Sequence, residues 1–155
     1  MHKIKADFPD LPIAINGGIK SHEDALLHLN TYESLPAVDG VMLGRSAYEQ
    51  PFLLADVDHL YYQESASTLS RDQVVEHMLP YIESHLTNGG KLIQVTRHML
   101  GLFHGLPGGR MRRRYLSQNA FKKSADVYVV RQAHQMVKDE IQRMHEQQIL
   151  REANQ

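Results

Sequence analysis

Apolar residues follow two different patterns along this chain, and the change between the patterns divides it. Up to about residue 62, short continuous apolar runs alternate with helix-like stretches. From Asp72 onward, apolar residues recur only at the three- and four-residue spacing of amphipathic helices. The pattern therefore predicts an α/β part over residues 1–62 and an all-α helical bundle over residues 63–155.

The first part is expected to contain two parallel strands with a helix between them. Continuous apolar runs are typical of strands in a parallel sheet that helices cover on both faces. We expect strands over 12–15 and 41–43, a helix from an N-cap at Ser21 to about Asn30, and a helix over 47–54 that Pro51 interrupts or restarts. This order predicts a β-α-β unit.

The second part is expected to follow a polar, serine-rich linker over residues 63–70. Helices are predicted over about 72–86, where Pro80 should cause a kink, over 92–103, over 110–122, and from about residue 126. Beyond about Met144, the glutamine- and glutamate-rich end is expected to fray or to be disordered.

Each predicted strand ends in a glycine turn. The first strand leads into Asn16-Gly17-Gly18 and the second into Gly44-Arg45. Glycine lets a backbone approach a phosphate closely, and the guanidinium of Arg45 matches phosphate oxygens. A glycine pair after a strand is often only a tight turn, but two such turns after consecutive strands favour one site for a phosphate-bearing ligand.

The composition of the 155 residues excludes several kinds of chemistry. With no cysteine, the chain has no disulfide, no thiolate metal site and no cysteine nucleophile. No apolar run approaches the roughly 18 residues that span a bilayer, and the first residues lack the apolar core of a signal peptide, so a cytoplasmic protein without a membrane segment is expected. Ten histidines lack the spacing of a metal site, and no metal is expected.

The formal net charge of −1 hides a strongly basic tract. Between Lys91 and Lys123 there are eight lysines and arginines and no acidic residue, whereas the rest of the chain has 18 acidic and nine basic residues. A solvated basic face is the simpler interpretation, but the length and purity of the tract favour a polyanionic partner, in particular a nucleic acid.

Four arginines concentrate this charge at the start of one predicted helix. Arg110, Arg113 and Arg114 would share a helix face, while Arg112 points elsewhere. Cations at a helix N-terminus oppose its dipole, so local stability does not explain them, whereas contact with phosphate does. Tyr115 or Phe121 could stack on a base or belong to the core, and the core is favoured for Phe121.

These same residues carry a family resemblance. Residues 15–20, 39–51, 96–110 and 115–120 resemble the tRNA-dihydrouridine synthases, and the last two segments resemble the A-type bacterial branch. The resemblance extends from about Lys3 to Lys138. It implies an enzyme with a flavin-bearing (β/α)8 (TIM) barrel followed by a helical tRNA-binding domain.

The resemblance also implies an activity and a set of site residues. NADPH reduces FMN, the reduced flavin delivers a hydride to C6 of a uridine flipped out of the tRNA, and a cysteine protonates C5; the A-type branch acts on the D-loop at positions 20 and 20a. By motif matching, the FMN phosphate falls on Asn16, Gly17, Gly18, Gly44 and Arg45. Arg110 and Arg113 fall on the pair of arginines through which this branch holds tRNA, next to Arg114.

The resemblance is confined to the C-terminal part of the family pattern. It covers the last two βα units of the barrel and the helical domain, without the cysteine that acts as acid. We therefore expect weak tRNA binding and no dihydrouridine synthesis by the 155 residues alone. The alternative is a stand-alone RNA-binding helical module with a non-catalytic barrel remnant. A different phosphate-binding barrel enzyme would explain the glycine turns but not the basic helical part.

Overall fold

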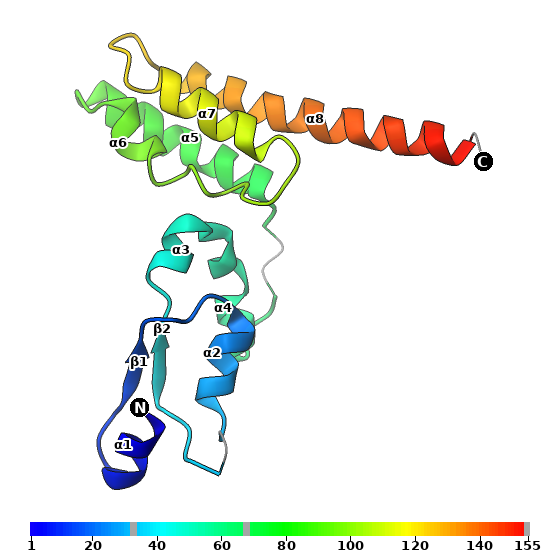
Figure 1. Ribbon diagram of the computed structural model, residues 1–155. Helices are drawn as coiled ribbons and strands as arrows, with labels where there is room; N and C mark the ends of the chain where they lie inside the picture. The colour runs from blue at the N-terminus through cyan, green and yellow to red at the C-terminus, as the bar shows by residue number, and fades with distance from the viewer. Residues whose placement is uncertain (32–33, 67–68, 154–155) are drawn as a thin grey trace. The chain divides into compact units, whose positions relative to one another are not determined.

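The computed structural model describes residues 1–31, 34–66 and 69–153 (Figure 1). Positions 67–68 of the predicted linker and the last two residues of the predicted tail lie outside this range. By packing, the chain divides into two compact units, Met1–Tyr48 and Glu49–Gln155, which are described separately. The domain boundary expected between residues 62 and 63 stays a prediction. The boundary between the two compact units lies earlier in the chain, between Tyr48 and Glu49.

The first unit is a small β-α-β arrangement. Its elements are α1 (His2–Asp7), β1 (Ala14–Asn16), α2 (His22–Leu29), β2 (Gly40–Met42) and the start of α3 (Arg45–Glu49). The two strands pair in parallel, with Asn16 opposite Met42 at the end of the ladder. Ser21 caps α2, because its hydroxyl oxygen accepts a hydrogen bond of 3.1 Å from the amide of Asp24. The expected β-α-β order and the Ser21 cap are thus confirmed.

The two strands are less buried than their apolar sequence predicts. In β1 only Ile15 is buried, between exposed Ala14 and Asn16, and in β2 Met42 is exposed. Side chains alternate between the two faces of a strand, so this pattern leaves one face of the pair uncovered. The expectation of strands covered on both faces was wrong for this sheet, in which two strands form the whole ladder among the described residues.

The second unit is helical. Its elements are the 3-10 helix η1 (Pro51–Asp56), α4 (Val57–Tyr62), α5 (Arg71–Thr87), α6 (Leu92–Thr96), α7 (Gly109–Asn119) and α8 (Val127–Ala153). In Figure 1, α7 runs along α8, and both α6 and α8 contact α5. The buried core joins these helices through residues such as Val75, Ile82, Leu92, Leu116 and Val130. Among the described residues, no helix is long and apolar enough to cross a membrane.

Local sequence features explain where two of these helices begin. Ser70 and Gln73 form a reciprocal capping box at the start of α5, with hydrogen bonds of 2.8 and 3.2 Å. Pro80 lies inside α5 on its exposed side, as expected for a residue that has no amide to donate. Pro51 begins η1, so the interruption predicted there is confirmed.

The last helix is longer than expected. Instead of fraying near Met144, α8 continues to Ala153. Side-chain pairs one helical turn apart support this segment: Gln142 donates to Glu146 and Gln148 donates to Glu152. The exposed polar composition that indicated disorder is also the composition that makes such pairs.

The predicted helix over 92–103 was wrong beyond Thr96. From there the chain forms successive tight turns, in which Met99, Leu102 and His104 each donate to the carbonyl three residues earlier. Three-residue turns place Met99 and Leu102 in the core much as a helix would, so the apolar spacing could not distinguish the two. Gly101 packs directly against the backbone carbonyl of Glu49, where a side chain would not fit.

Two basic side chains are buried inside the helical unit. Arg112 is fully buried, donates from Nη1 to the carbonyl of Met99 (2.7 Å), and lies over the ring of Phe103. Burial lowers the pKa of Arg112 to about 10. His134 packs against the same ring, and its two buried ring nitrogens make no hydrogen bond to the described residues. The ring of Phe103 thus contacts Arg112 of α7 and His134 of α8.

The burial of His134 predicts a loss of stability in mild acid. Desolvation, helped by Lys138, lowers the pKa of His134 below its ordinary value of 6.5, although Asp72 at 3.5 Å opposes this shift. Below pH 6.5 the unfolded chain therefore binds a proton that the folded chain resists, and the free energy of unfolding falls by up to about 1.4 kcal/mol per pH unit. Urea titrations between pH 8 and 5 should show this fall.

Replacement of His134 by glutamine should remove that part of the pH slope, whatever it does to stability at pH 8. The exposed His145 lies on the same helix and provides the control. A slope that persists in His134→Gln, or that disappears in His145→Gln, would contradict the assignment.

Candidate functional site

The two predicted glycine turns lie at the same edge of the two-stranded sheet. Because β1 and β2 are parallel and Asn16 is opposite Met42, their carboxyl ends are adjacent. The segment Asn16-Gly17-Gly18 therefore leaves the sheet beside Gly44 and Arg45. Ligands of parallel sheets bind at this edge, beyond the carboxyl ends of the strands. The structure thus brings the five predicted phosphate-site residues to neighbouring strand ends.

The first turn has a backbone that only glycine adopts without strain. Gly17 and Gly18 have φ angles of +107° and +82°. Apart from each glycine and its chain neighbours, no described residue has an atom within 4 Å of where their Cβ atoms would be. The space above these two residues is open, so a phosphate oxygen can approach their backbone. At the second turn, Arg45 is exposed and its guanidinium carries the positive charge that such an anion needs.

A residue that was not predicted joins the two turns. The hydroxyl of Ser46 donates to the carbonyl of Ile19 at 3.2 Å, which connects the start of α3 to the loop after β1. Two amides around the start of α2 bond within the chain: Lys20 donates to the carboxylate of Asp24, and Asp24 donates to the hydroxyl of Ser21. These bonds leave the two glycine turns as the predicted phosphate site.

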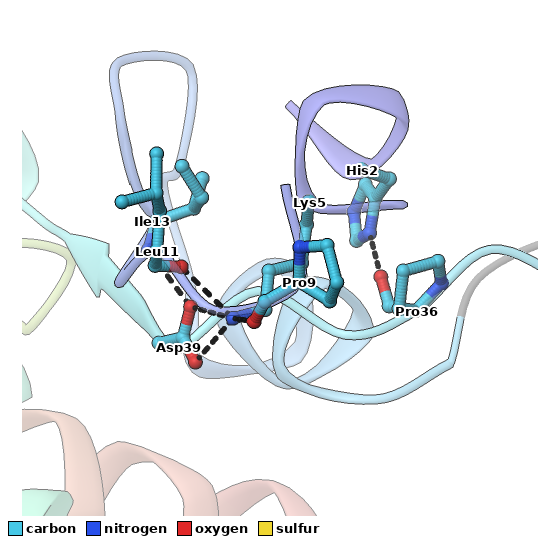
Figure 2. Close-up of polar contacts among 7 residues, drawn as sticks. All are labelled: His2, Lys5, Pro9, Leu11, Ile13, Pro36 and Asp39. Carbon is cyan, nitrogen blue, oxygen red and sulfur yellow. Dashed lines mark hydrogen bonds and ion pairs between the residues drawn. The ribbon is translucent and has the colours of Figure 1, made fainter. Parts of the chain in front are cut away.

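The opposite edge of the sheet holds a polar network (Figure 2). The ammonium of Lys5 donates to the carbonyl oxygens of Pro9 and Leu11, at 2.8 and 2.9 Å, and contacts both carboxylate oxygens of Asp39. The other bond of that carboxylate comes from the amide of Ile13 at 2.7 Å, just before β1. Asp39 directly precedes β2, so the network aligns the amino ends of both strands.

These bonds lower the pKa of Asp39, first through the amide of Ile13 and then through Lys5. The carboxylate therefore contributes to stability at neutral pH, and this contribution is lost as the pH falls below the ordinary pKa of 3.8. Nearby, His2 lies 2.8 Å from the carbonyl of Pro36 and stacks on His28. These groups contact one another, which is the arrangement of a structural network. The other edge, with Asn16-Gly17-Gly18 and Gly44-Arg45, is called the glycine edge and stays the predicted phosphate site.

In the helical unit, α7 presents the predicted arginines. Arg110, Arg113 and Arg114 are all exposed, whereas Arg112 is buried, so the division between the two groups is confirmed. The helix begins after Gly108, whose φ of +75° turns the chain where a Cβ would crowd the backbone of Val137. Packing of the loop before α7 onto α8 therefore determines where the first arginines lie.

Arg110 and Arg113 border one hollow of about 530 Å³. Its wall is the loop from Leu100 to Gly109, with four glycines, and its lining also includes Glu140 of α8. The charge of Glu140 is offset by Arg143, whose guanidinium contacts both carboxylate oxygens at 2.6 and 2.7 Å. Guanidinium groups beside an open, glycine-lined backbone can hold phosphate groups.

The two aromatic candidates have different surroundings. Tyr115 packs against the core, which leaves it as a structural residue. Phe121 is 66% exposed, so the preference for a core position was wrong: it follows α7 in a turn, where the chain has already left the packed helices. His98 is exposed and accepts a hydrogen bond of 2.9 Å from Arg97. In the part of the chain that the structure describes, no group of three metal-ligating side chains comes together.

Comparison with known proteins identifies a family for the chain. The sequence model described as dihydrouridine synthase matches residues 1–148. A tRNA-dihydrouridine(20/20a) synthase of Shewanella oneidensis is 49% identical over 141 residues, which cover 91% of this chain and 40% of that protein. The enzymes of the same name from Vibrio cholerae and Escherichia coli strain K12 are 49% and 48% identical, over 85% and 90% of this chain and 38% and 39% of theirs.

The chain thus spans about 40% of the length of these relatives and aligns with their C-terminal portion. The match continues through both glycine turns and the arginine-rich helix, so it includes both units of the structure. This chain belongs to the dihydrouridine synthase family.

Proposed function

We propose that these residues are the C-terminal portion of an FMN-dependent tRNA-dihydrouridine synthase that reduces D-loop uridines 20 and 20a. The observation that carries the proposal is the pair of glycine turns at one edge of a parallel sheet, joined by Ser46. In this proposal β1 and β2, with the helices that follow them, are the last two βα units of a TIM barrel, and the helical unit is its tRNA-binding domain.

The glycine edge would hold the phosphate of FMN. Asn16, Gly17 and Gly18 offer an open backbone, and Gly44 with Arg45 offers a second turn and a positive charge. When bound and reduced by NADPH, the flavin supplies the hydride for the reaction. These five residues anchor and orient the cofactor's phosphate end, and none of them is a catalytic acid.

The arginines of α7 would hold the tRNA. Arg110 and Arg113 border the same hollow and Arg114 is exposed on the same helix, so the three can neutralise neighbouring phosphates of a folded RNA. Such an enzyme acts on tRNA in the cytoplasm. The rival proposal is an RNA-binding module in which the strands are only a scaffold; it shares the arginines but needs no flavin.

A flavin titration separates the two proposals. If the glycine edge holds a phosphate, the chain should bind FMN more tightly than riboflavin, which lacks the phosphate. Arg45→Ala should weaken FMN binding about tenfold or more, the effect of a lost charge-assisted hydrogen bond, and leave riboflavin binding unchanged. Lys3→Ala, which removes an exposed cation from α1, serves as the control. The measurement is quenching of flavin fluorescence.

Equal affinity for FMN and riboflavin would contradict a phosphate site at the glycine edge. RNA binding without any flavin binding would favour the rival. As a companion readout, the 155 residues incubated with FMN, NADPH and unmodified tRNA should form no dihydrouridine, because they contain no cysteine to protonate C5. Formation of dihydrouridine would overturn that part of the proposal.

A further inference from the structure

A second hollow in the helical unit, of about 580 Å³, has an apolar floor. The side chains of Val74 and Met78 from α5 line it, together with Val95, Met99 and Leu102. The turns over 99–103 separate it from the hollow at α7, because Met99 and Leu102 line the second hollow while Leu100 and Phe103 line the first. The two hollows therefore lie on either side of one short segment.

The rim of this second hollow carries an exposed aromatic ring. Tyr81 of α5 is 57% exposed and stacks on the ring of His85, with ring centroids 6.3 Å apart and an interplanar angle of 19°. The His85 ring lies directly against Gly90, where any side chain would overlap it. The stacking on His85 therefore positions the exposed Tyr81 ring at the edge of the apolar hollow.

The polar side chain of Gln94 contacts the His85 ring on which Tyr81 stacks. The Oε1 atom of Gln94 lies 3.1 Å from His85 Nε2 and accepts a hydrogen bond of 2.8 Å from the amide of Lys91. Gln94 lines the hollow, and its –NH₂ group is a hydrogen-bond donor there. A side-chain amide near an aromatic ring can form a hydrogen bond with the edge of a base that stacks on that ring.

Among the described residues, no Asp or Glu lines this hollow. Arg97 directly precedes the lining residue His98, and the backbone amide of Lys91 donates to the lining residue Gln94; both basic residues belong to the acid-free tract. The acidic groups Asp72 and Glu76 of α5 instead face α8, where they contact His134 and Arg131 at 3.5 and 3.7 Å. An apolar surface with an exposed aromatic ring and basic residues nearby is suited to bind a nucleobase that is attached to a phosphate backbone.

We propose that this second hollow binds an unpaired nucleobase of the RNA whose backbone contacts α7, with Tyr81 as the stacking surface. The inference rests on the proposed function, because it assumes that the helical unit binds RNA. It adds a contact that reads an exposed base rather than a phosphate.

The test compares Tyr81→Ala with Tyr128→Ala, which removes an equally exposed tyrosine (60%) from α8. Binding of tRNA is measured by fluorescence anisotropy at several salt concentrations. Loss of a stacked base should weaken binding about 5- to 150-fold in Tyr81→Ala, with an unchanged salt dependence because no phosphate contact is lost. Tyr81→Phe, which keeps the ring, should bind like the unaltered chain, and so should Tyr128→Ala.

A Tyr81→Ala variant that binds as tightly as Tyr128→Ala, or whose salt dependence falls, would overturn this inference while leaving RNA binding through α7 intact. Failure of the unaltered chain to bind tRNA would overturn both this inference and the proposed function. Far-UV circular dichroism and the melting temperature confirm that the variants fold; since Tyr81 is largely exposed, both should match the unaltered chain.

Discussion

Replacement of both Arg110 and Arg113 by alanine should weaken tRNA binding by at least about 100-fold. Each exposed guanidinium borders the same hollow and can make charge-assisted hydrogen bonds to phosphate, worth about 1.5–3 kcal/mol, or roughly 10- to 100-fold in affinity. Each lost phosphate contact should also lower the magnitude of the slope of log K against log salt by about 0.7–0.9. Anisotropy titrations with labelled tRNA between 50 and 200 mM salt measure both quantities.

The same substitutions should not destabilise the fold. Arg110 and Arg113 lie in the first turns of α7, where cations oppose the helix dipole, so their removal should leave stability unchanged or raise it by a few tenths of a kcal/mol each. Weaker binding with equal or greater stability would mark the two arginines as residues kept for RNA. Arg151→Ala, an exposed arginine of α8, is the matched control. An unchanged salt slope in the double variant would show that neither arginine contacts phosphate.

Gly109→Ala should destabilise the helical unit by about 3 kcal/mol or more. A Cβ at Gly109 would overlap the backbone carbonyl of Phe103, and neither of these backbone segments can rotate away as a side chain can. The clash falls at the first residue of α7, so the helix must shift together with the adjacent Arg110. Urea unfolding measures the stability loss, and tRNA affinity should fall in the fraction that stays folded.

Gly105 offers a control from the same loop. Its φ is also unusual, at +77°. Beyond its chain neighbours, no described residue has an atom within 4 Å of its would-be Cβ, so alanine there costs only the backbone strain of about 1–2 kcal/mol. A Gly109→Ala variant no less stable than Gly105→Ala would contradict the view that close packing against Phe103 sets the position of α7.

The elements that could be predicted are those whose signals are local. Ser21 caps its helix through its own neighbour three residues on, and Pro51 starts a new turn because it has no amide to donate. The two glycine turns could be placed at one edge because consecutive parallel strands necessarily end on the same side. The separation of Arg112 from the other arginines follows from helical geometry alone.

The features that escaped prediction depend on partners distant in sequence. Lys5 and Asp39 are 34 residues apart, and nothing in their spacing indicates that they bond. Gly101 packs against the carbonyl of Glu49, 52 positions earlier, which occupies the space of a side chain, and its own sequence context does not indicate this contact. Phenylalanine is a residue type that is usually buried, yet Phe121 is exposed because it follows the end of α7. Tertiary contacts decided each of these cases.

The salt dependence of tRNA binding by the unaltered chain, set beside that of the Arg110→Ala, Arg113→Ala double variant, tests the central claim most directly. The claim is that the basic face of α7 in this family member holds the phosphates of tRNA. It predicts that log K falls linearly with log salt for the unaltered chain and that the slope is smaller by about 1.4–1.8 in the double variant. Absence of binding at 50 mM salt, or identical slopes for the two proteins, would contradict it.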